Sequence, residues 1–311
     1  MIKNKFYAVA ILLALIILGI FFFKKAIPLK KFSKLTDATY ITYYKKACTL
    51  KDSQACNELG DIYHYGNGVG EDHEDAVEYY KQSCKLESGA GCNNLAYMLD
   101  QGLGIEEQNW QALKLYQKSC KYGEMEGCYN VGSMYFRGDG TRKNYYKAAQ
   151  YFKKTCNAGI GKACNNLAYM HAHGKYGKRD IYTAISLYYD ACEMGEPAGC
   201  NNLGYMYEMG NGVTQDDMKA EKFYTAACEL NDVPSCNRLG TVYGKRIQEI
   251  KSNVDLKVAE KSCGLGNAII CYKIGLYYEK KNDRSTAQEY FEQACNKGQS
   301  QSCKHLGDIL R

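Results

Sequence analysis

The chain has 311 residues, a formal net charge of +6 and 24% charged residues, with lysines and acids interspersed along most of its length. This modest excess of positive charge leaves no concentrated basic patch, so we predict no nucleic-acid partner. The composition is unusual in its 16 cysteines, which only five histidines accompany. The spacing of the cysteines is therefore the main guide to how the chain is organised.

A short basic flank, residues 1–5, precedes an uninterrupted apolar run of eighteen residues at positions 6–23. At about 1.5 Å per residue, a helix of this length just crosses the hydrocarbon core of a bilayer. The flanking lysines are typical of a signal peptide, but Phe21–Phe23 and two further lysines occupy the place of a small-residue cleavage site. We predict a signal anchor at 6–23, with a cleaved signal peptide as the alternative, followed by a basic linker at 24–35.

From residue 36 to residue 311 the chain repeats one unit eight times, and each unit holds two cysteines eight residues apart. The first six units recur every 36 residues, and the last two follow at intervals of 35 and 32 residues. A fixed period in this range is typical of a protein built from stacked repeats. The pairs are Cys48 and Cys56, Cys84 and Cys92, Cys120 and Cys128, Cys156 and Cys164, Cys192 and Cys200, Cys228 and Cys236, Cys263 and Cys271, and Cys295 and Cys303.

All sixteen cysteines fall into these pairs with none left over, which predicts eight disulfides in an oxidising compartment. Zinc is the alternative for paired cysteines. The spacing fits structural zinc sites poorly, however, and few histidines are available as further ligands. We therefore predict no metal and no cofactor, and expect each closed loop to stabilise the fold by about 2–3 kcal/mol.

Each unit predicts two helices. After the second cysteine, apolar residues recur at helical spacing, as in Leu59 and Tyr63, with a small residue between them that lets a neighbouring helix approach. We name this helix A, and expect a turn such as Gly66–Gly68 to end it. A phosphate-binding loop would need a preceding strand, which nothing indicates. Helix B follows, with an alanine and an aromatic residue on one face, as in Ala76 and Tyr80. The repeat region begins with a helix B and ends with a helix A, so the natural unit is a B–A hairpin joined by its disulfide.

The repeated pattern LGxxY…GxGV…A-x-x-Y-Y-x-x-A/S-C, clearest at 59–69, 131–156 and 203–228, resembles the Sel1-like repeat family, which is related to tetratricopeptide repeats. The paired cysteines are similar to those of the Helicobacter cysteine-rich protein subfamily. The resemblance covers residues 36–311. It implies an all-α fold: a right-handed α/α solenoid of about eight disulfide-clipped helix hairpins, preceded by one N-terminal hydrophobic segment, with a concave surface that serves as a scaffold or binds peptides. It also implies, from some subfamily members, penicillin binding and slow hydrolysis of β-lactams.

The residues two and five positions after the second cysteine lie on the face of helix A opposite its packed stripe. Asparagine and tyrosine recur there. If helix A lines the concave side, as the resemblance implies, asparagine amides and tyrosine rings would suit an extended peptide. The alternative is that these are helix-start asparagines on a solvated surface. The predicted ligand-binding residues are Asn94, Tyr97, Asn130, Asn166, Tyr169, Asn202, Tyr205 and Arg238.

The residues offer little support for catalysis. A serine β-lactamase would need S-x-x-K and K-T-G elements, and neither occurs in the sequence. No histidine is placed by the sequence near a serine or cysteine as in a triad, and oxidised cysteines are not nucleophiles. We therefore predict a non-enzymatic interaction protein that binds a protein, a peptide or a cell-wall (peptidoglycan) fragment. The alternative, carried by the resemblance alone, is a penicillin-binding protein with weak β-lactamase activity.

The predicted location follows from two opposed signals. Five lysines in the linker at 24–35 favour the cytoplasmic side of a membrane, whereas eight cysteine pairs favour an oxidising side. The pairs are the stronger signal, so we expect the repeats outside the cytoplasm. The protein would be anchored in the inner membrane through residues 6–23 and face the periplasm, or be secreted if that segment is cleaved. The linker would lie close to anionic head groups.

Overall fold

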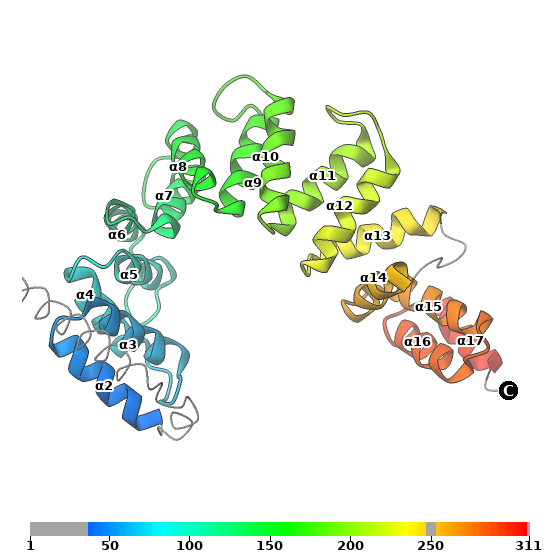
Figure 1. Cartoon of the computed structure of the whole chain (residues 1–311), viewed down its shortest axis with the longest axis horizontal. Helices are drawn as coiled ribbons and strands as arrows, with labels where there is room; N and C mark the ends of the chain where they lie inside the picture. Colours follow the sequence, from blue (N-terminus) through cyan, green and yellow to red (C-terminus); the bar gives the residue numbers. More distant parts are fainter. Residues whose placement is uncertain (1–36, 247–252, 310–311) are drawn as a thin grey trace, which may run out of the picture.

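The computed structural model describes residues 37–246 and 253–309, and within them the chain is a curved stack of sixteen helices without a strand (Figure 1). The segments predicted at 1–5, 6–23 and 24–35 lie outside the described residues. None of the described helices has the length and apolar character to span a membrane. The helices are α2 (Asp37–Thr49), α3 (Ser53–Tyr65), α4 (His73–Lys85), α5 (Gly89–Gln101), α6 (Asn109–Lys121), α7 (Met125–Arg137), α8 (Tyr145–Asn157), α9 (Gly161–Ala172), α10 (Ile181–Glu193), α11 (Pro197–Met209), α12 (Asp217–Glu229), α13 (Val233–Arg246), α14 (Asn253–Gly264), α15 (Ala268–Lys280), α16 (Arg284–Asn296) and α17 (Ser300–Ile309).

Eight disulfides join each even-numbered helix to the odd-numbered helix that follows it. The first cysteine of a pair lies near the end of a helix B and the second in the first turn of a helix A, with Cα atoms 4.4–4.8 Å apart. The bonds are Cys48–Cys56, Cys84–Cys92, Cys120–Cys128, Cys156–Cys164, Cys192–Cys200, Cys228–Cys236, Cys263–Cys271 and Cys295–Cys303. The predicted pairing and the B–A hairpin are both confirmed. So many disulfides are typical of an oxidising environment outside the cytoplasm.

Polar caps and glycines set the limits of the helices. The carboxylate of Asp72 accepts a hydrogen bond from the backbone N–H of Asp75 at the start of α4, and Asp180 does the same for Thr183 in α10. Such caps stabilise a helix start by about 1 kcal/mol. At the other end, α3 stops at Gly66, whose φ of 68° is strained for residues with a side chain. The Gly-x-Gly turn thus acts as a helix terminator, as predicted.

The close approach of helices A and B depends on a glycine packed against an aromatic ring. A Cβ atom added to Gly60 would lie 2.3 Å from Cε1 of Tyr80, and one added to Gly204 would lie 2.7 Å from Cδ1 of Tyr224. Both tyrosine rings are buried. These contacts confirm that the small residue of helix A lets the next helix B approach, and that part of the high tyrosine content packs between helices.

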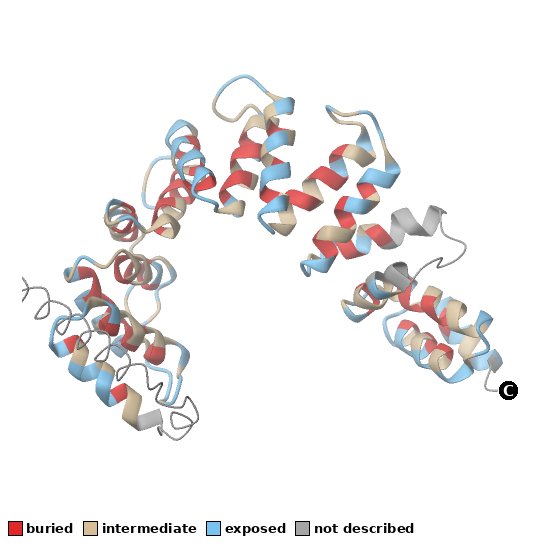
Figure 2. Cartoon of the chain, in the orientation of Figure 1, coloured by how far each residue is buried: buried red, intermediate tan, exposed pale blue. Residues whose placement is uncertain are grey.

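The buried residues form five clusters that follow one another along the stack rather than one central core (Figure 2). Odd-numbered helices also contact the next odd-numbered helix: α3 contacts α5, α5 contacts α7, and α9 contacts α11. Successive helices lie closest on the inner side of an arc, and α3, α5, α7 and α9 are on that side (Figure 1). Helices α3, α5, α7 and α9 therefore line the concave face, and the contact of α9 with α11 continues this row, which is the arrangement that the predicted site requires; farther along, the B helices α12 and α14 also contact each other.

Candidate functional site

The concave face displays three of the predicted tyrosines. Tyr97, Tyr169 and Tyr205 stand at the same position of α5, α9 and α11, and 44%, 37% and 42% of their surfaces are exposed. Their neighbours in the apolar stripe, such as Leu95 and Ala96, are buried. The helical period thus separates the two faces: one holds the stack together, and the other presents a tyrosine to solvent.

Neighbouring repeats hold these rings in place. Tyr97 makes an edge contact with the ring of His64 in α3, at a centroid distance of 6.3 Å. Tyr169 makes an edge contact with Phe136 in α7 at 6.1 Å, and stacks on His173 at 4.0 Å. Each tyrosine therefore loses little conformational freedom when a ligand covers it, which favours binding.

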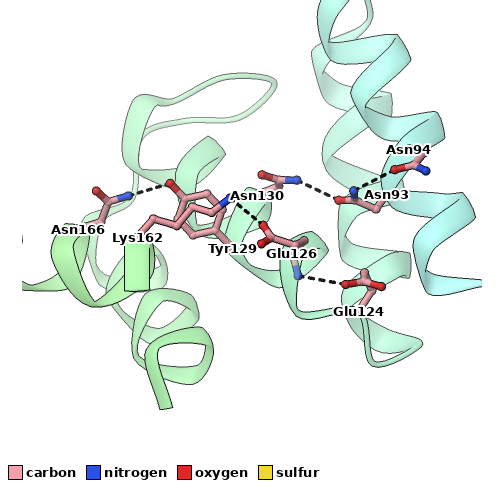
Figure 3. A network of polar contacts seen from close by, with 8 residues as sticks. All are labelled: Asn93, Asn94, Glu124, Glu126, Tyr129, Asn130, Lys162 and Asn166. Carbon is pink, nitrogen blue, oxygen red and sulfur yellow. Dashed lines mark hydrogen bonds and ion pairs between the residues drawn. The ribbon is translucent and has the colours of Figure 1, made fainter. Parts of the chain in front are cut away.

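The predicted asparagines form hydrogen-bonded rungs between repeats, a role that the sequence analysis missed. Each donates from its side-chain amide to a residue that lies 37 positions earlier, in the preceding repeat. Figure 3 shows two of these rungs side by side. The bonds run from Asn94 to Asn57 Oδ1 (3.1 Å), from Asn130 to Asn93 Oδ1 (2.9 Å), from Asn166 to the Tyr129 hydroxyl (3.2 Å) and from Asn202 to Asn165 Oδ1 (2.8 Å). The acceptor is the residue directly after the second cysteine of the previous repeat, and it is an asparagine in three of the four rungs. This recurring asparagine was the signal in the sequence.

Three of the rungs keep an acceptor for a ligand. Among the hydrogen bonds of the described residues, the side-chain oxygens of Asn130, Asn166 and Asn202 accept none. Asn94 differs, because its oxygen accepts from Asn93 at 3.4 Å and its amide also lies 3.3 Å from a carboxylate oxygen of Asp61. The rungs are therefore not equivalent, and the three later ones are better suited to bind a peptide backbone.

Arg238 closes the series with a charged contact. Its guanidinium donates to Glu208 Oε2 at 2.8 Å and to the hydroxyl of Tyr224 at 3.1 Å, and lies 5.0 Å from the ring centroid of Tyr205. The Tyr224 hydroxyl in turn donates to Glu208 at 2.6 Å. Burial and this hydrogen bond raise the pKa of Tyr224, which stays protonated. The cluster fixes Tyr205 beside a paired rather than an isolated charge.

A second carboxylate binds the equivalent helix-B tyrosine at the start of the stack, although it stands three positions earlier on helix A than Glu208 does. Asp61 accepts from the hydroxyl of Tyr80 at 2.7 Å, and burial raises the pKa of this carboxyl. Burial also raises the pKa of Asp100 on the next helix A. Asp61, Asp100 and Glu208 are not among the residues predicted from the sequence. The signal in the sequence was an acidic residue on helix A, followed by a tyrosine on the next helix B with which it could form a hydrogen bond.

The histidines of the described chain have neighbours that suit structure rather than catalysis. The Nε2 atom of His171 lies 2.6 Å from the hydroxyl of Tyr176, and His305 lies 3.0 Å from a carboxylate oxygen of Glu279. No histidine in this part of the chain is hydrogen-bonded to a serine, and no three His, Cys, Asp or Glu side chains there are grouped to hold a metal ion.

Solved structures of other proteins share the fold. The fold is similar to a protective antigen of uropathogenic Escherichia coli, c5321, at a TM-score of 0.62 and 24% identity over 89% of this chain, which spans 60% of that protein's length. A Sel1 repeat protein from Oxalobacter formigenes matches at a TM-score of 0.59 and 26% identity, over 78% of this chain and 99% of its own length. Helicobacter pylori cysteine-rich protein B matches 43% of the chain and 98% of its own length, at 27% identity and a TM-score of 0.36.

No curated protein sequence matches the chain significantly. The sequence model of the Sel1 repeat, in contrast, matches six segments: residues 53–88, 89–123, 126–160, 161–196, 197–232 and 263–299. These segments cover well over half of the chain, and each spans a helix A and the helix B that follows it. The chain therefore belongs to the Sel1 repeat family.

Proposed function

We propose that this protein is an extracytoplasmic scaffold that binds an extended segment of another protein along its concave face. Sel1 repeat proteins generally mediate protein–protein interactions. The observation that carries the proposal is the regular series of exposed, laterally held tyrosines beside asparagine oxygens that accept no hydrogen bond in the described chain. The two features occur together on α9 and α11, whereas α7 has the buried Ser133 at the position of the tyrosine.

An extended peptide fits the chemistry of this series. Its backbone N–H groups would donate to the oxygens of Asn130, Asn166 and Asn202, one acceptor for each repeat. Its side chains would pack on Tyr169 and Tyr205, which supply large contact areas at a low entropic cost. Backbone recognition of this kind tolerates many sequences, so the tyrosines would set the preference.

The proposed location is the periplasmic side of an inner membrane. The eight disulfides support an oxidising compartment, and the apolar run at 6–23, outside the described residues, supports an anchor. A secreted protein is the outcome if the segment is cleaved. Mass spectrometry of the protein recovered from cells distinguishes the two, because cleavage removes the N-terminal peptide.

The proposal is tested by crosslinking at Tyr205. A photoreactive residue is placed at Tyr205 in the full chain, and the matched control carries it at Tyr43, which is 65% exposed on α2. We expect peptide crosslinks in periplasmic extract from position 205 and not from position 43, and competition by excess unlabelled peptide. Equal labelling from both positions would refute the concave site. Competition by muropeptides instead of peptides would replace the protein segment by a cell-wall fragment.

A separate variant tests the contribution of the rings. Tyr169→Ser with Tyr205→Ser leaves the asparagine rungs intact, so binding should fall while the melting temperature changes little. β-Lactam binding is the alternative implied by family likeness. A chromogenic β-lactam assay on the full chain addresses it: we expect no turnover, and turnover that persists through repurification would favour the hydrolase.

A further inference from the structure

Four successive B helices expose an apolar side chain at one position, ten residues before the first cysteine. The residues are Trp110, Tyr146, Tyr182 and Met218, with 53%, 64%, 77% and 68% of their surfaces exposed. We name them the rim stripe. Single exposed apolar residues are ordinary on protein surfaces, but four at the same place in four consecutive repeats form a line. The concave site uses none of them.

The rim stripe runs along one edge of the stack. The loops before α8 and α12 lie against the start of the previous helix B: a Cβ atom added to Gly140 would be 2.7 Å from the backbone nitrogen of Trp110, and one added to Gly212 would be 2.6 Å from Ile181. The loops after α7, α9 and α11 lie on the outer side of the arc (Figure 1), where much of the surface is exposed (Figure 2). Tyr146, Tyr182 and Met218 follow these outer loops directly, and the Gly140 loop joins Trp110 to the same edge.

Basic side chains surround the middle of the rim stripe. Arg142 and Lys143 in the loop before α8, and Lys178 and Arg179 in the loop before α10, are all exposed. The ammonium of Lys114 lies 4.6 Å from the ring centroid of Trp110. Aromatic rings and cations thus share the middle of this edge, at Tyr146 and Tyr182, whereas exposed acids precede Trp110 and Met218 at its two ends.

We propose that the rim stripe rests on the surface of an anionic membrane, with the concave face turned away from it. Tryptophan and tyrosine favour the boundary between head groups and acyl chains, and each nearby lysine or arginine strengthens attachment to anionic lipid. A protein partner fits less well, because a single convex row of side chains offers no pocket in which a desolvated contact centre could form. A fluid bilayer surface follows such a row without needing a matching shape.

The chain contains a built-in reporter for this contact. Trp110 is its single tryptophan, so tryptophan fluorescence reports on the rim stripe and not on the apolar segment at 6–23. The full chain is reconstituted in phosphatidylcholine vesicles with or without phosphatidylglycerol, each containing brominated lipid as a quencher. We expect a blue shift, quenching by the brominated lipid and protection from acrylamide in the anionic vesicles only.

Charge variants make the test specific. Replacing Arg142, Lys143 and Lys178 with serine should lower the equilibrium constant for contact between the rim stripe and the anionic vesicle surface on the order of a hundredfold. High salt should act in the same direction. The matched control is Lys85→Ser with Lys121→Ser, at exposed positions on the opposite ends of α4 and α6. Far-UV circular dichroism verifies that each variant is folded.

Three results would overturn the proposal. One is a Trp110 that acrylamide reaches equally in anionic vesicles, neutral vesicles and detergent. Another is equal quenching in neutral and anionic vesicles, which would remove the role of the basic residues. The third is protection of Trp110 only when a soluble protein is added, which would identify the rim stripe as a protein-binding edge.

Discussion

The disulfide Cys156–Cys164 offers a direct measure of what the covalent bonds contribute. It joins α8 to α9 in the middle of the stack, and both residues are buried. Closing a loop of eight-residue separation lowers the entropy of the unfolded chain by the equivalent of about 2.5 kcal/mol. We expect the variant Cys156→Ala with Cys164→Ala to lose about that much free energy of unfolding, and to melt about 5–10 °C lower by circular dichroism.

Position in the stack supplies the control. Cys295–Cys303 joins α16 and α17, the last two described helices, and Cys303 is exposed. Because each repeat contacts only its neighbours, removing this bond should loosen that end and leave the main transition nearly unchanged. Reducing all eight bonds removes about 20 kcal/mol in the same loop-entropy estimate, more than the about 5–15 kcal/mol that typically separates folded from unfolded protein. The reduced chain should therefore be largely unfolded.

Two results would refute this reasoning. A reduced and alkylated chain that keeps its helical spectrum and its melting transition would show that stacking alone sustains the fold. The argument for an oxidising compartment would then lose its energetic basis. A native preparation whose cysteines alkylate without reductant, detected by mass spectrometry, would contradict the pairing itself.

Three further predictions concern packing, the rungs and pH. Gly199→Ala should destabilise the fold by about 1–3 kcal/mol in chemical denaturation, because its Cβ would lie 2.6 Å from Ala191 Cβ and 2.9 Å from a backbone nitrogen, whereas Gly177→Ala meets nothing within 4 Å and should be neutral. Asn202 and Asn165 should show a coupling of about 1 kcal/mol in a double-mutant cycle of unfolding free energies, and zero coupling would remove the rung. Burial raises the pKa of Asp61 in the folded state, so the contribution of this carboxyl to stability is greatest below its unfolded pKa and decreases as pH rises through its folded pKa. Asp61→Asn should flatten that decrease in a series of denaturation midpoints measured against pH. An unchanged slope would contradict this prediction.

The repeat architecture could be predicted because its determinants are local in sequence. Three local features recur at fixed spacing: the paired cysteines, a glycine that ends helix A, such as Gly66, and a small residue on helix A followed by an aromatic residue on helix B, such as Gly60 and Tyr80. Spacing along a helix translates directly into which face a residue occupies. The hairpins, their bonds and the exposed face of helix A were therefore accessible without coordinates.

The rungs were not accessible because they depend on how one repeat sits on the next. Asn202 donates to Asn165 rather than to a residue one whole period earlier, and this offset reflects the rotation between successive hairpins. Helical periodicity within one hairpin carries no information about that rotation. The same reasoning applies to Glu208, whose partners Tyr224 and Arg238 come from the following helices.

The tyrosines show how a sound general interpretation can conceal a particular feature. Tyr80 and Tyr224 do pack between helices, as the spacing predicts. Tyr146 and Tyr182 stand at the start of helix B, on neither the packed stripe nor the concave face, and the overall tyrosine count masked their common position. Aligning the repeats by their cysteines, rather than counting residues, would have revealed the rim stripe.

The rungs also determine how the concave site must be tested. Each carboxamide uses its nitrogen to hold two repeats together and leaves its oxygen toward a ligand, as in Asn166 and Asn202. Replacing either asparagine with alanine therefore removes a stacking contact and a binding contact at once, and a loss of binding would not distinguish the two. In the described chain, the side chains of Tyr169 and Tyr205 join neighbouring repeats through ring contacts, to Phe136 and to Arg238, and not through hydrogen bonds, so their replacement costs the stack less than the loss of a rung. A loss of binding in Tyr205→Ser at an unchanged melting temperature therefore identifies recognition, whereas the same loss in Asn202→Ala is equally explained by a loosened arc.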